Sequence, residues 1–169
     1  MDVLPSFIEW FLKYFLPPMI ANASPVLLRG GRPVDGGRRF IDGKPLLGPG
    51  KTWQGLIIGV YMGTLSSLPI SIYFESIIYM INGFAASLSA LLGDMLGSFI
   101  KRRLGIPRGD PLPFLDQLDF ALAASLYYWL VDPGFRRPDY LFYSLLLILV
   151  LHIATNNIAY VLGVKDRRW

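Results

Sequence analysis

The chain has 169 residues, of which 53% are hydrophobic and 17% are charged, and it contains no cysteine. Soluble domains usually carry about a quarter charged residues, so this composition excludes an ordinary soluble globule, and its apolar content excludes a disordered chain. A chain without Cys excludes a disulfide framework and a cysteine-based zinc site. The net charge of +4 favours contact with an anionic surface or an anionic substrate over binding of nucleic acid.

Two weak candidates for membrane spans lie at the start of the chain and in its second half. Residues 4–28 are apolar but include Glu9 and Lys13, and Pro17 and Pro18 are expected to kink the helix or to separate an interfacial first half. This segment lacks the basic leading region and the small-residue cleavage site of a secretory signal peptide. Residues 116–132 are short, so they would span only if other helices shielded their first turn from lipid.

Three other segments are strong candidates. Residues 54–74 carry no charge, residues 76–100 carry only Asp94, and residues 140–164 contain His152 as their one titratable group besides tyrosines. A helix of about 20 apolar residues crosses a hydrocarbon core of roughly 30 Å, so each segment is predicted to span. The sequence therefore predicts an all-α integral membrane protein, with about five transmembrane helices in a single membrane-embedded domain over residues 1–169.

The positive charges predict the orientation of these spans. Of the 16 Lys and Arg residues, 13 lie in residues 29–51, residues 101–108 and the tail, whereas only Lys13, Arg136 and Arg137 lie on the opposite side. Cytoplasmic loops carry an excess of Lys and Arg, so the N-terminus is predicted outside and the C-terminus in the cytoplasm of a multi-pass cell-membrane protein. The cytoplasmic loops are then residues 29–53 and 101–115.

The first of these loops is rich in glycine and arginine, with seven Gly and six Lys or Arg between residues 29 and 51. One interpretation is a solvated loop that satisfies the charge rule. The other is that glycine N–H groups close on phosphate oxygens while cations such as Arg29, Arg32 and Arg38 neutralise them. Both interpretations stay open at this point.

The end of this loop, Gly48-Pro49-Gly50-Lys51-Thr52, has the Lys and the hydroxyl of a P-loop but not its pattern. Position 45 would have to be Gly and is Pro45, and no strand is predicted before it. Lys51 remains a candidate phosphate ligand at the cytoplasmic start of a span. Thr52 is either an N-cap or a substrate contact, and Trp53 is typical of a membrane anchor.

Polar side chains share one face of the predicted helix over residues 76–100 and its continuation: Asp94, Ser98, Lys101 and Arg102. Asp116 and Asp119 share one face at the start of the next span. Carboxylates at membrane depth are costly and are functional candidates by default. A Mg²⁺ site that faces a phosphate substrate would explain all three carboxylates.

Structural alternatives exist for each carboxylate. Asp94 could form an ion pair with Lys101 or with an Arg of the glycine-rich loop. Asp116 could be a helix N-cap, with Asp119 as the acid of a capping box. The three carboxylates and the neighbouring cations, taken together, favour the metal site.

Three motifs resemble the CDP-diacylglycerol synthase (phosphatidate cytidylyltransferase) superfamily: Lys51-Thr52-Trp53, Gly93-Asp94-x-x-x-Ser98-x-x-Lys101-Arg102 and Leu115-Asp116-x-x-Asp119. Asn22-x-x-Pro25-Val26 and the runs over residues 29–37 and 114–119 are similar to its archaeal branch, the CDP-archaeol synthases. The resemblance covers residues 22–124. It departs at Gln117, where bacterial and eukaryotic members typically carry Arg.

The resemblance implies transfer of CMP from CTP to an isoprenoid ether lipid phosphate, the unsaturated archaetidic acid, giving CDP-archaeol and pyrophosphate. Mg²⁺ is the implied cofactor, CTP and membrane lipid are the implied partners, and nucleic acid is not one. A homodimer is a candidate assembly. The implied catalytic residues are Lys101 and the metal ligands Asp94, Asp116 and Asp119. The implied substrate-binding residues are Lys51, Thr52, Ser98, Arg102, Arg29, Arg32, Arg38 and Asn22.

Other function classes are weighed against this one. A bacterial-type phosphatidate cytidylyltransferase would use the same motifs with a different lipid. A CDP-alcohol phosphotransferase needs D-x-x-D-G-x-x-A-R, but Phe120 follows Asp119. An ion-coupled transporter would use His152, Asn156 and Asn157 as a polar path, although such residues are more often interhelical hydrogen-bond partners. A membrane scaffold would explain the spans but not the convergence of carboxylates and cations.

Overall fold

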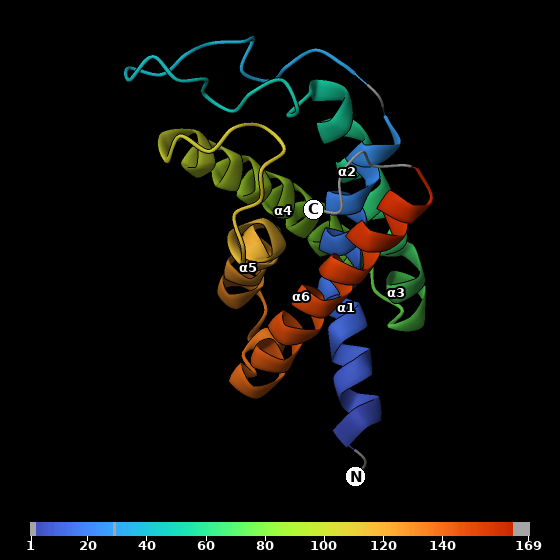
Figure 1. Cartoon of the computed structure of the whole chain (residues 1–169). Coiled ribbons are helices and arrows are strands. Elements are labelled where there is room, and N and C mark those ends of the chain that lie inside the picture. Colours follow the sequence, from blue (N-terminus) through green and yellow to red (C-terminus); the bar gives the residue numbers. More distant parts are fainter. Residues whose placement is uncertain (1–2, 29, 164–169) are drawn as a thin grey trace.

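A computed structural model describes residues 3–28 and 30–163, and every regular element in these ranges is a helix (Figure 1). The elements are α1 (Val3–Ala23), η1 (Ser24–Leu27), α2 (Trp53–Ser66), α3 (Leu68–Tyr73), α4 (Ile78–Arg103), α5 (Leu115–Val131), η2 (Pro133–Phe135) and α6 (Pro138–Val161). The predicted all-α fold is confirmed. Each of the five ranges predicted as spans falls on a helix.

Three helical segments in the described ranges are long and apolar enough to cross a membrane: residues 53–73, which comprise α2 and α3, and the helices α4 and α6. They coincide with the three strong predictions from the sequence. The shorter α5 has 17 residues, about 25 Å at 1.5 Å per residue.

The prolines in two of the predicted spans have different effects on the helices. Helix α1 continues through Pro17 and Pro18, so the expected division into two halves does not occur. Both prolines are fully buried, and neighbouring helices make proline tolerable inside a membrane helix. The segment predicted as one span over residues 54–74 is instead interrupted at Ser67, and the new helix α3 begins at Leu68 with Pro69 in its first turn.

The outer part of α1 is held by aromatic side chains. The rings of Trp10 and Phe135 stack at 5.0 Å, and Tyr14 contacts Phe135 edge-on at the same distance. The Tyr14 hydroxyl also donates to Asp132 over 2.9 Å. These contacts fix α1 against the connection between α5 and α6, far from the cation-rich loops.

Helices α4 and α5 pack closely because glycine faces the contact. A Cβ on Gly93 would lie 2.5 Å from both the Cβ of Ala123 and the carbonyl oxygen of Asp119, and a Cβ on Gly97 would collide with the Asp119 carboxylate. At Gly93 the obstacle includes backbone, so only glycine permits this approach, whereas at Gly97 the obstacle is a side chain. The close packing brings the start of α5, with its two carboxylates, against the polar face of α4.

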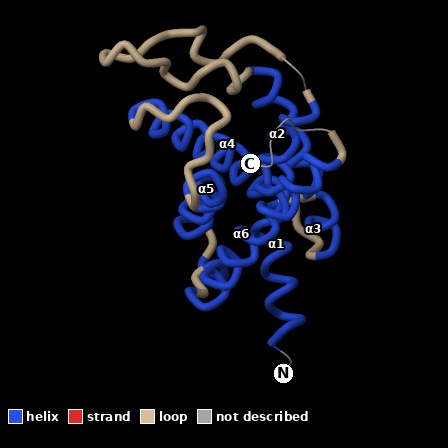
Figure 2. The backbone as a smooth tube through the Cα atoms, viewed as in Figure 1, coloured by secondary structure: helices blue, strands red, loops and turns tan. Residues whose placement is uncertain are grey.

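The two long loops, residues 30–52 and 104–114, lie at the same end of the bundle, whereas the N-terminal end of α1 points the opposite way (Figures 1 and 2). The first is the glycine- and arginine-rich loop, whereas three of the cations predicted in the second loop, Lys101, Arg102 and Arg103, lie in the last turn of α4 at the same end. Their shared position is the arrangement that the predicted sidedness requires.

Candidate active site

The glycine-rich loop is folded around one carboxylate. Asp35 is buried and accepts hydrogen bonds from the backbone N–H groups of Gly37, Leu47 and Gly48 over 2.9, 2.9 and 3.0 Å. Burial raises the pKa of Asp35, but the backbone donors outweigh it and hold the pKa below the ordinary value of 3.8. The loop therefore has a defined conformation that carries its last residues to the helices.

Arg103 at the end of α4 anchors the same loop. Its guanidinium lies between the rings of Phe40 and Phe99, 4.8 and 4.9 Å from their centroids. It also pairs with Asp42 at 2.6 Å and donates to the carbonyl of Pro45. Arg103 is not among the predicted site residues, because its partner Asp42 lies 61 positions away in the sequence and meets it only in the folded loop.

Lys51 and Asp94 form an ion pair with a separation of 2.5 Å. The Lys51 carbonyl accepts from Val34 N over 2.8 Å, which fixes the backbone from which the side chain extends. Thr52 caps α2 by accepting from Gly55 N over 3.1 Å, so the N-cap interpretation is confirmed. The alternatives that paired Asp94 with Lys101 or a loop arginine are wrong, because the folded loop delivers Lys51 to this position.

Asp116 pairs with Lys101 of α4. The Lys101 Nζ lies 2.7 and 2.9 Å from the two carboxylate oxygens of Asp116. Asp116 also accepts from Leu112 N over 2.9 Å. The N-cap of α5 is Phe114, with φ of +66°, and its side chain makes no capping bond. The interpretation of Asp116 as an N-cap is therefore wrong, since α5 begins at Leu115 and Asp116 is already its second residue.

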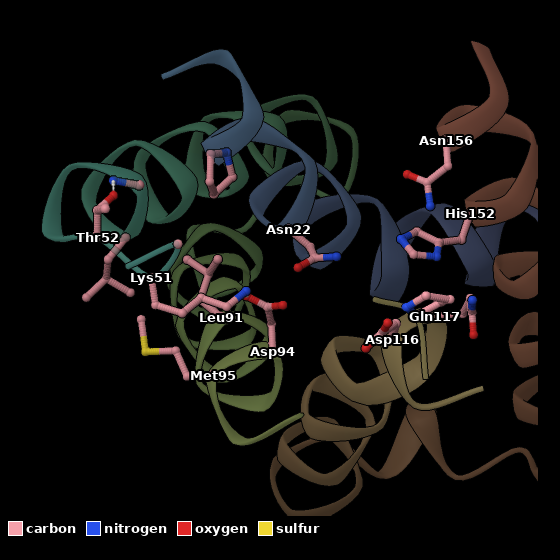
Figure 3. Close-up of a pocket in the computed structure, with 15 residues that line it drawn as sticks. Asn22, Lys51, Thr52, Leu91, Asp94, Met95, Asp116, Gln117, His152 and Asn156 are labelled. Atoms are coloured by element: carbon pink, nitrogen blue, oxygen red, sulfur yellow. Dashed lines mark hydrogen bonds and ion pairs between the residues drawn. The ribbon is translucent and has the colours of Figure 1, made fainter. Parts of the chain in front are cut away.

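A cavity of about 250 Å³ lies where these elements meet (Figure 3). Lys51 and Thr52 lie on one side of it, His152 and Asn156 of α6 on the other, and Asn22 of α1 between them. Its full lining is Asn22, Pro25, Gly50, Lys51, Thr52, Gly55, Leu56, Leu91, Asp94, Met95, Pro111, Asp116, Gln117, His152 and Asn156. Residues from the glycine-rich loop and from five helices thus converge on one space.

The cavity brings together five of the predicted site residues: Asn22, Lys51, Thr52, Asp94 and Asp116. Among the described side chains, several others that were predicted do not line it: Arg32, Arg38, Ser98, Lys101, Arg102 and Asp119. Lys101 reaches the site only through its bond to Asp116. Arg29 lies outside the described residues, as does the tail from residue 164.

Asp119 lies in the contact between α4 and α5. Its carboxylate faces Gly97 and accepts from Phe120 N over 2.7 Å. No group of three His, Cys, Asp or Glu side chains placed to hold a metal occurs in the described part of the chain. Asp94 and Asp116 nevertheless line the same cavity, and Mg²⁺ commonly takes one or two carboxylates together with substrate phosphates and water. Asp94 and Asp116 are the candidate residues for such a site.

Three residues that line the cavity are not among the site residues predicted from the sequence: Gln117, His152 and Asn156. Gln117 is 4% exposed, and its Oε1 has no hydrogen-bond partner among the described residues. His152 and Asn156 were weighed as a transporter path or as interhelical hydrogen-bond partners, and not as residues of this site. Their spacing on α6 showed that they share a face, but no sequence signal indicated that this face turns toward Asp94 and Asp116.

Comparison with known proteins agrees with this architecture. A family model described as CarS-like, CDP-archaeol synthase, matches residues 4–169. The chain is 57% identical over 165 residues to a CDP-archaeol synthase of Staphylothermus marinus, covering 96% of this chain and 94% of the relative. It is 42% identical over 166 residues to a CDP-archaeol synthase of Thermococcus gammatolerans, covering 95% of each.

A solved structure is also similar, with a TM-score of 0.77 and 41% sequence identity over 86% of this chain and 91% of that one. It is described as "Structural insight into an intramembrane enzyme for archaeal membrane lipids biosynthesis". Together with the apolar helices, this similarity establishes a multi-pass membrane protein. The chain belongs to the CDP-archaeol synthase family and is a nucleotidyltransferase of membrane-lipid synthesis.

Proposed function

We propose that the chain transfers CMP from CTP to the phosphate of an isoprenoid ether lipid, the unsaturated archaetidic acid, releasing pyrophosphate and forming CDP-archaeol. The observation that carries this proposal is the placement of Lys51, Asp94 and Asp116 on one cavity between the helices, where Lys51 pairs with Asp94 and Asp116 is held from outside the lining by Lys101. Such a site matches substrates whose phosphates bear several negative charges. The family name of the relatives supports the same assignment.

The reaction needs no side-chain base. A phosphate monoester has a second pKa near 6, so the lipid phosphate is already a nucleophile at neutral pH. One of its oxygens attacks the α-phosphorus of CTP in line, the bond to the β-phosphate oxygen breaks, and pyrophosphate leaves with that electron pair. Catalysis is then positioning of the two phosphates and neutralisation of their charge.

Lys51 and Lys101 supply the protein's positive charge in this scheme. An ammonium group has three donors, so Lys51 can hold the Asp94 carboxylate and a phosphate oxygen at the same time. Lys51 enters from the folded loop and lines the cavity, whereas Lys101 at the end of α4 acts on the site through its pair with Asp116. Thr52 lies beside Lys51 in the cavity and offers a backbone and hydroxyl contact to the same phosphates.

Asp94 and Asp116 would hold Mg²⁺, which neutralises charge on the phosphates when bound. Asp119 lies behind them in the α4–α5 contact, and we assign to it the spacing of these two helices rather than direct metal ligation. We assign the site to the cytoplasmic side, with the N-terminus outside and the C-terminus in the cytoplasm, because CTP is a cytoplasmic nucleotide and the glycine-rich loop with its cations borders the cavity.

A transfer assay with the purified protein tests the proposal. Labelled CTP, Mg²⁺ and digeranylgeranylglyceryl phosphate are expected to give labelled lipid and an equal amount of pyrophosphate. Parallel reactions with phosphatidic acid distinguish the ether lipid from the bacterial-type substrate, and the unphosphorylated diether alcohol is the matched blank. Equal labelling of that alcohol, or consumption of CTP without pyrophosphate, would contradict the assignment.

A further inference from the structure

A second cavity adjoins the first and shares its wall. It measures about 210 Å³, and Asn22, His152 and Asn156 line both cavities. The rest of its lining is almost entirely apolar: Met19, Ala23, Val26, Phe120, Ile148, Leu151, Thr155 and Ala159. It lies between α1, α5 and α6, on the side of the first cavity away from the glycine-rich loop.

The polarity of the lining changes in one direction from the first cavity to the second. The end near the loop carries charges, on Lys51, Asp94 and Asp116. The shared wall, formed by Asn22 of α1 and by His152 and Asn156 of α6, offers uncharged hydrogen-bonding groups. Residues 140–163 contain no Asp, Glu, Lys or Arg. Beyond this wall the lining is apolar.

We propose that Asn22, His152 and Asn156 bind the glycerol–ether linkage of the lipid substrate, an inference that rests on the proposed function. That substrate has the same order of polarity as the cavities: a charged phosphate, an uncharged glycerol with two ether oxygens, and hydrocarbon chains. Ether oxygens only accept hydrogen bonds. The amide NH₂ groups of Asn22 and Asn156 and the imidazole N–H of His152 are donors that suit them.

The burial of Asn156 supports this assignment over a role in helix packing alone. Its side chain is 8% exposed and faces both cavities, whereas the adjacent Asn157 is exposed and donates to Ile153 O of its own helix over 2.8 Å. Two asparagines on the same turn thus have opposite surroundings. They form a matched pair for an experiment.

The first test compares Asn156→Leu and Asn157→Leu in steady-state kinetics with digeranylgeranylglyceryl phosphate and CTP. Loss of a donor opposite a buried acceptor raises the KM for the lipid about five- to tenfold in Asn156→Leu. The KM for CTP stays within about twofold, which also reports that the variant is folded. Asn157→Leu changes neither constant. A rise confined to the KM for CTP would overturn the proposal and assign this wall to the nucleotide.

The second test changes the lipid instead of the protein. Phytanyl phosphate has a phosphate and a branched hydrocarbon chain but no glycerol, so it lacks the ether oxygens. The wild type is expected to prefer the diether phosphate, and Asn156→Leu or Asn22→Leu to lose about five- to tenfold of that preference. An equal loss with both lipids would overturn the proposal.

A measurement of lipid binding in the absence of CTP tests this inference independently of the proposed reaction. Stabilisation of the wild type by the diether phosphate, measured as an increase in Tm without CTP, should exceed that of Asn156→Leu at the same lipid concentration. If the wild type binds the lipid in this way but releases no pyrophosphate with CTP, the proposed reaction is wrong and the binding site stands. Equal stabilisation of both proteins would contradict the site.

Discussion

Lys51 Nζ lies 2.5 Å from a carboxylate oxygen of Asp94, so one ion pair joins the end of the glycine-rich loop to the membrane-embedded part of α4. Both side chains are about one-quarter exposed and both line the cavity. An exposed surface pair would contribute little to stability. A pair at the mouth of a cavity places a positive and a negative group where phosphates and a metal ion are expected.

Variants of the Lys51–Asp94 pair distinguish a role in stability from a role in catalysis. Asp94→Asn and Lys51→Met should each lower kcat/KM by about 10²–10³, the range found when one electrostatic contact to a transition state is removed. The double reversal Lys51→Asp with Asp94→Lys restores an ion pair, so its Tm in detergent should recover while its activity does not. Recovery of transfer activity in the double variant would show that the pair is only structural.

Asp116→Asn should raise the Mg²⁺ concentration needed for half-maximal activity, because one carboxylate charge is removed from the site. The maximal rate should fall by about 10²-fold or more. Functional units are strongly non-additive, so adding Asp94→Asn should cause little further loss. The matched control is Asp139→Asn, an exposed carboxylate that pairs with Arg137 at the opposite end of the bundle. Equal Mg²⁺ dependence in all variants would refute the metal role.

Two glycines of α4 should respond differently to Ala. Gly93→Ala brings a methyl group against the backbone of Asp119, and overpacking costs about 1–3 kcal/mol, which outweighs a helix-propensity gain of about 1 kcal/mol. Its Tm should fall. In Gly97→Ala the obstacle is the Asp119 carboxylate, which can rotate, so the Tm should change less and the transfer rate should fall. Leu96→Ala, on the exposed face of the same helix, is the control.

The glycine-rich loop should lose order in acid because of Asp35. Its folded pKa is lowered, so ionised Asp35 stabilises the loop above pH 3.8, and this contribution disappears as the pH falls through the lower folded value. Hydrogen-exchange protection of the Leu47 and Gly48 amides should therefore exceed that of the same amides in Asp35→Asn at pH 7, and the difference should vanish as the pH falls through the lowered pKa of Asp35. Amides within α5 provide the internal reference. A pH-independent difference would be inconsistent with this role.

Membrane orientation can be read from single cysteines, since the chain has none of its own. Ile41, at 93% exposure in the glycine-rich loop, and Ser76, in the turn between α3 and α4, are suitable sites. A membrane-impermeant thiol reagent added to intact cells should label Ser76→Cys, and Ile41→Cys only after the cytoplasmic face is opened. The reverse pattern would invert the topology.

The helices could be predicted from the sequence because membrane insertion is a local requirement. A continuous apolar run of about 20 residues has few alternatives to a spanning helix, so the three strong candidates fall on helical segments. The same simplicity explains the two errors in the fold. Neither the continuity of α1 through Pro17 and Pro18 nor the break at Ser67 depends on apolarity, since both depend on what packs against the prolines.

The residue types of the site were also evident from the sequence, because carboxylates and cations next to apolar spans are costly unless they act or pair. Their partners were not. Asp94 pairs with Lys51 across 43 positions of sequence, and Asp116 with Lys101 across 15, through a loop folded on Asp35 and through helices brought together at Gly93 and Gly97. Spacing on one helix predicts which side chains share a face. Only the packing of several helices decides what that face meets, which is why Asn156 and His152 joined the site in the tertiary structure alone.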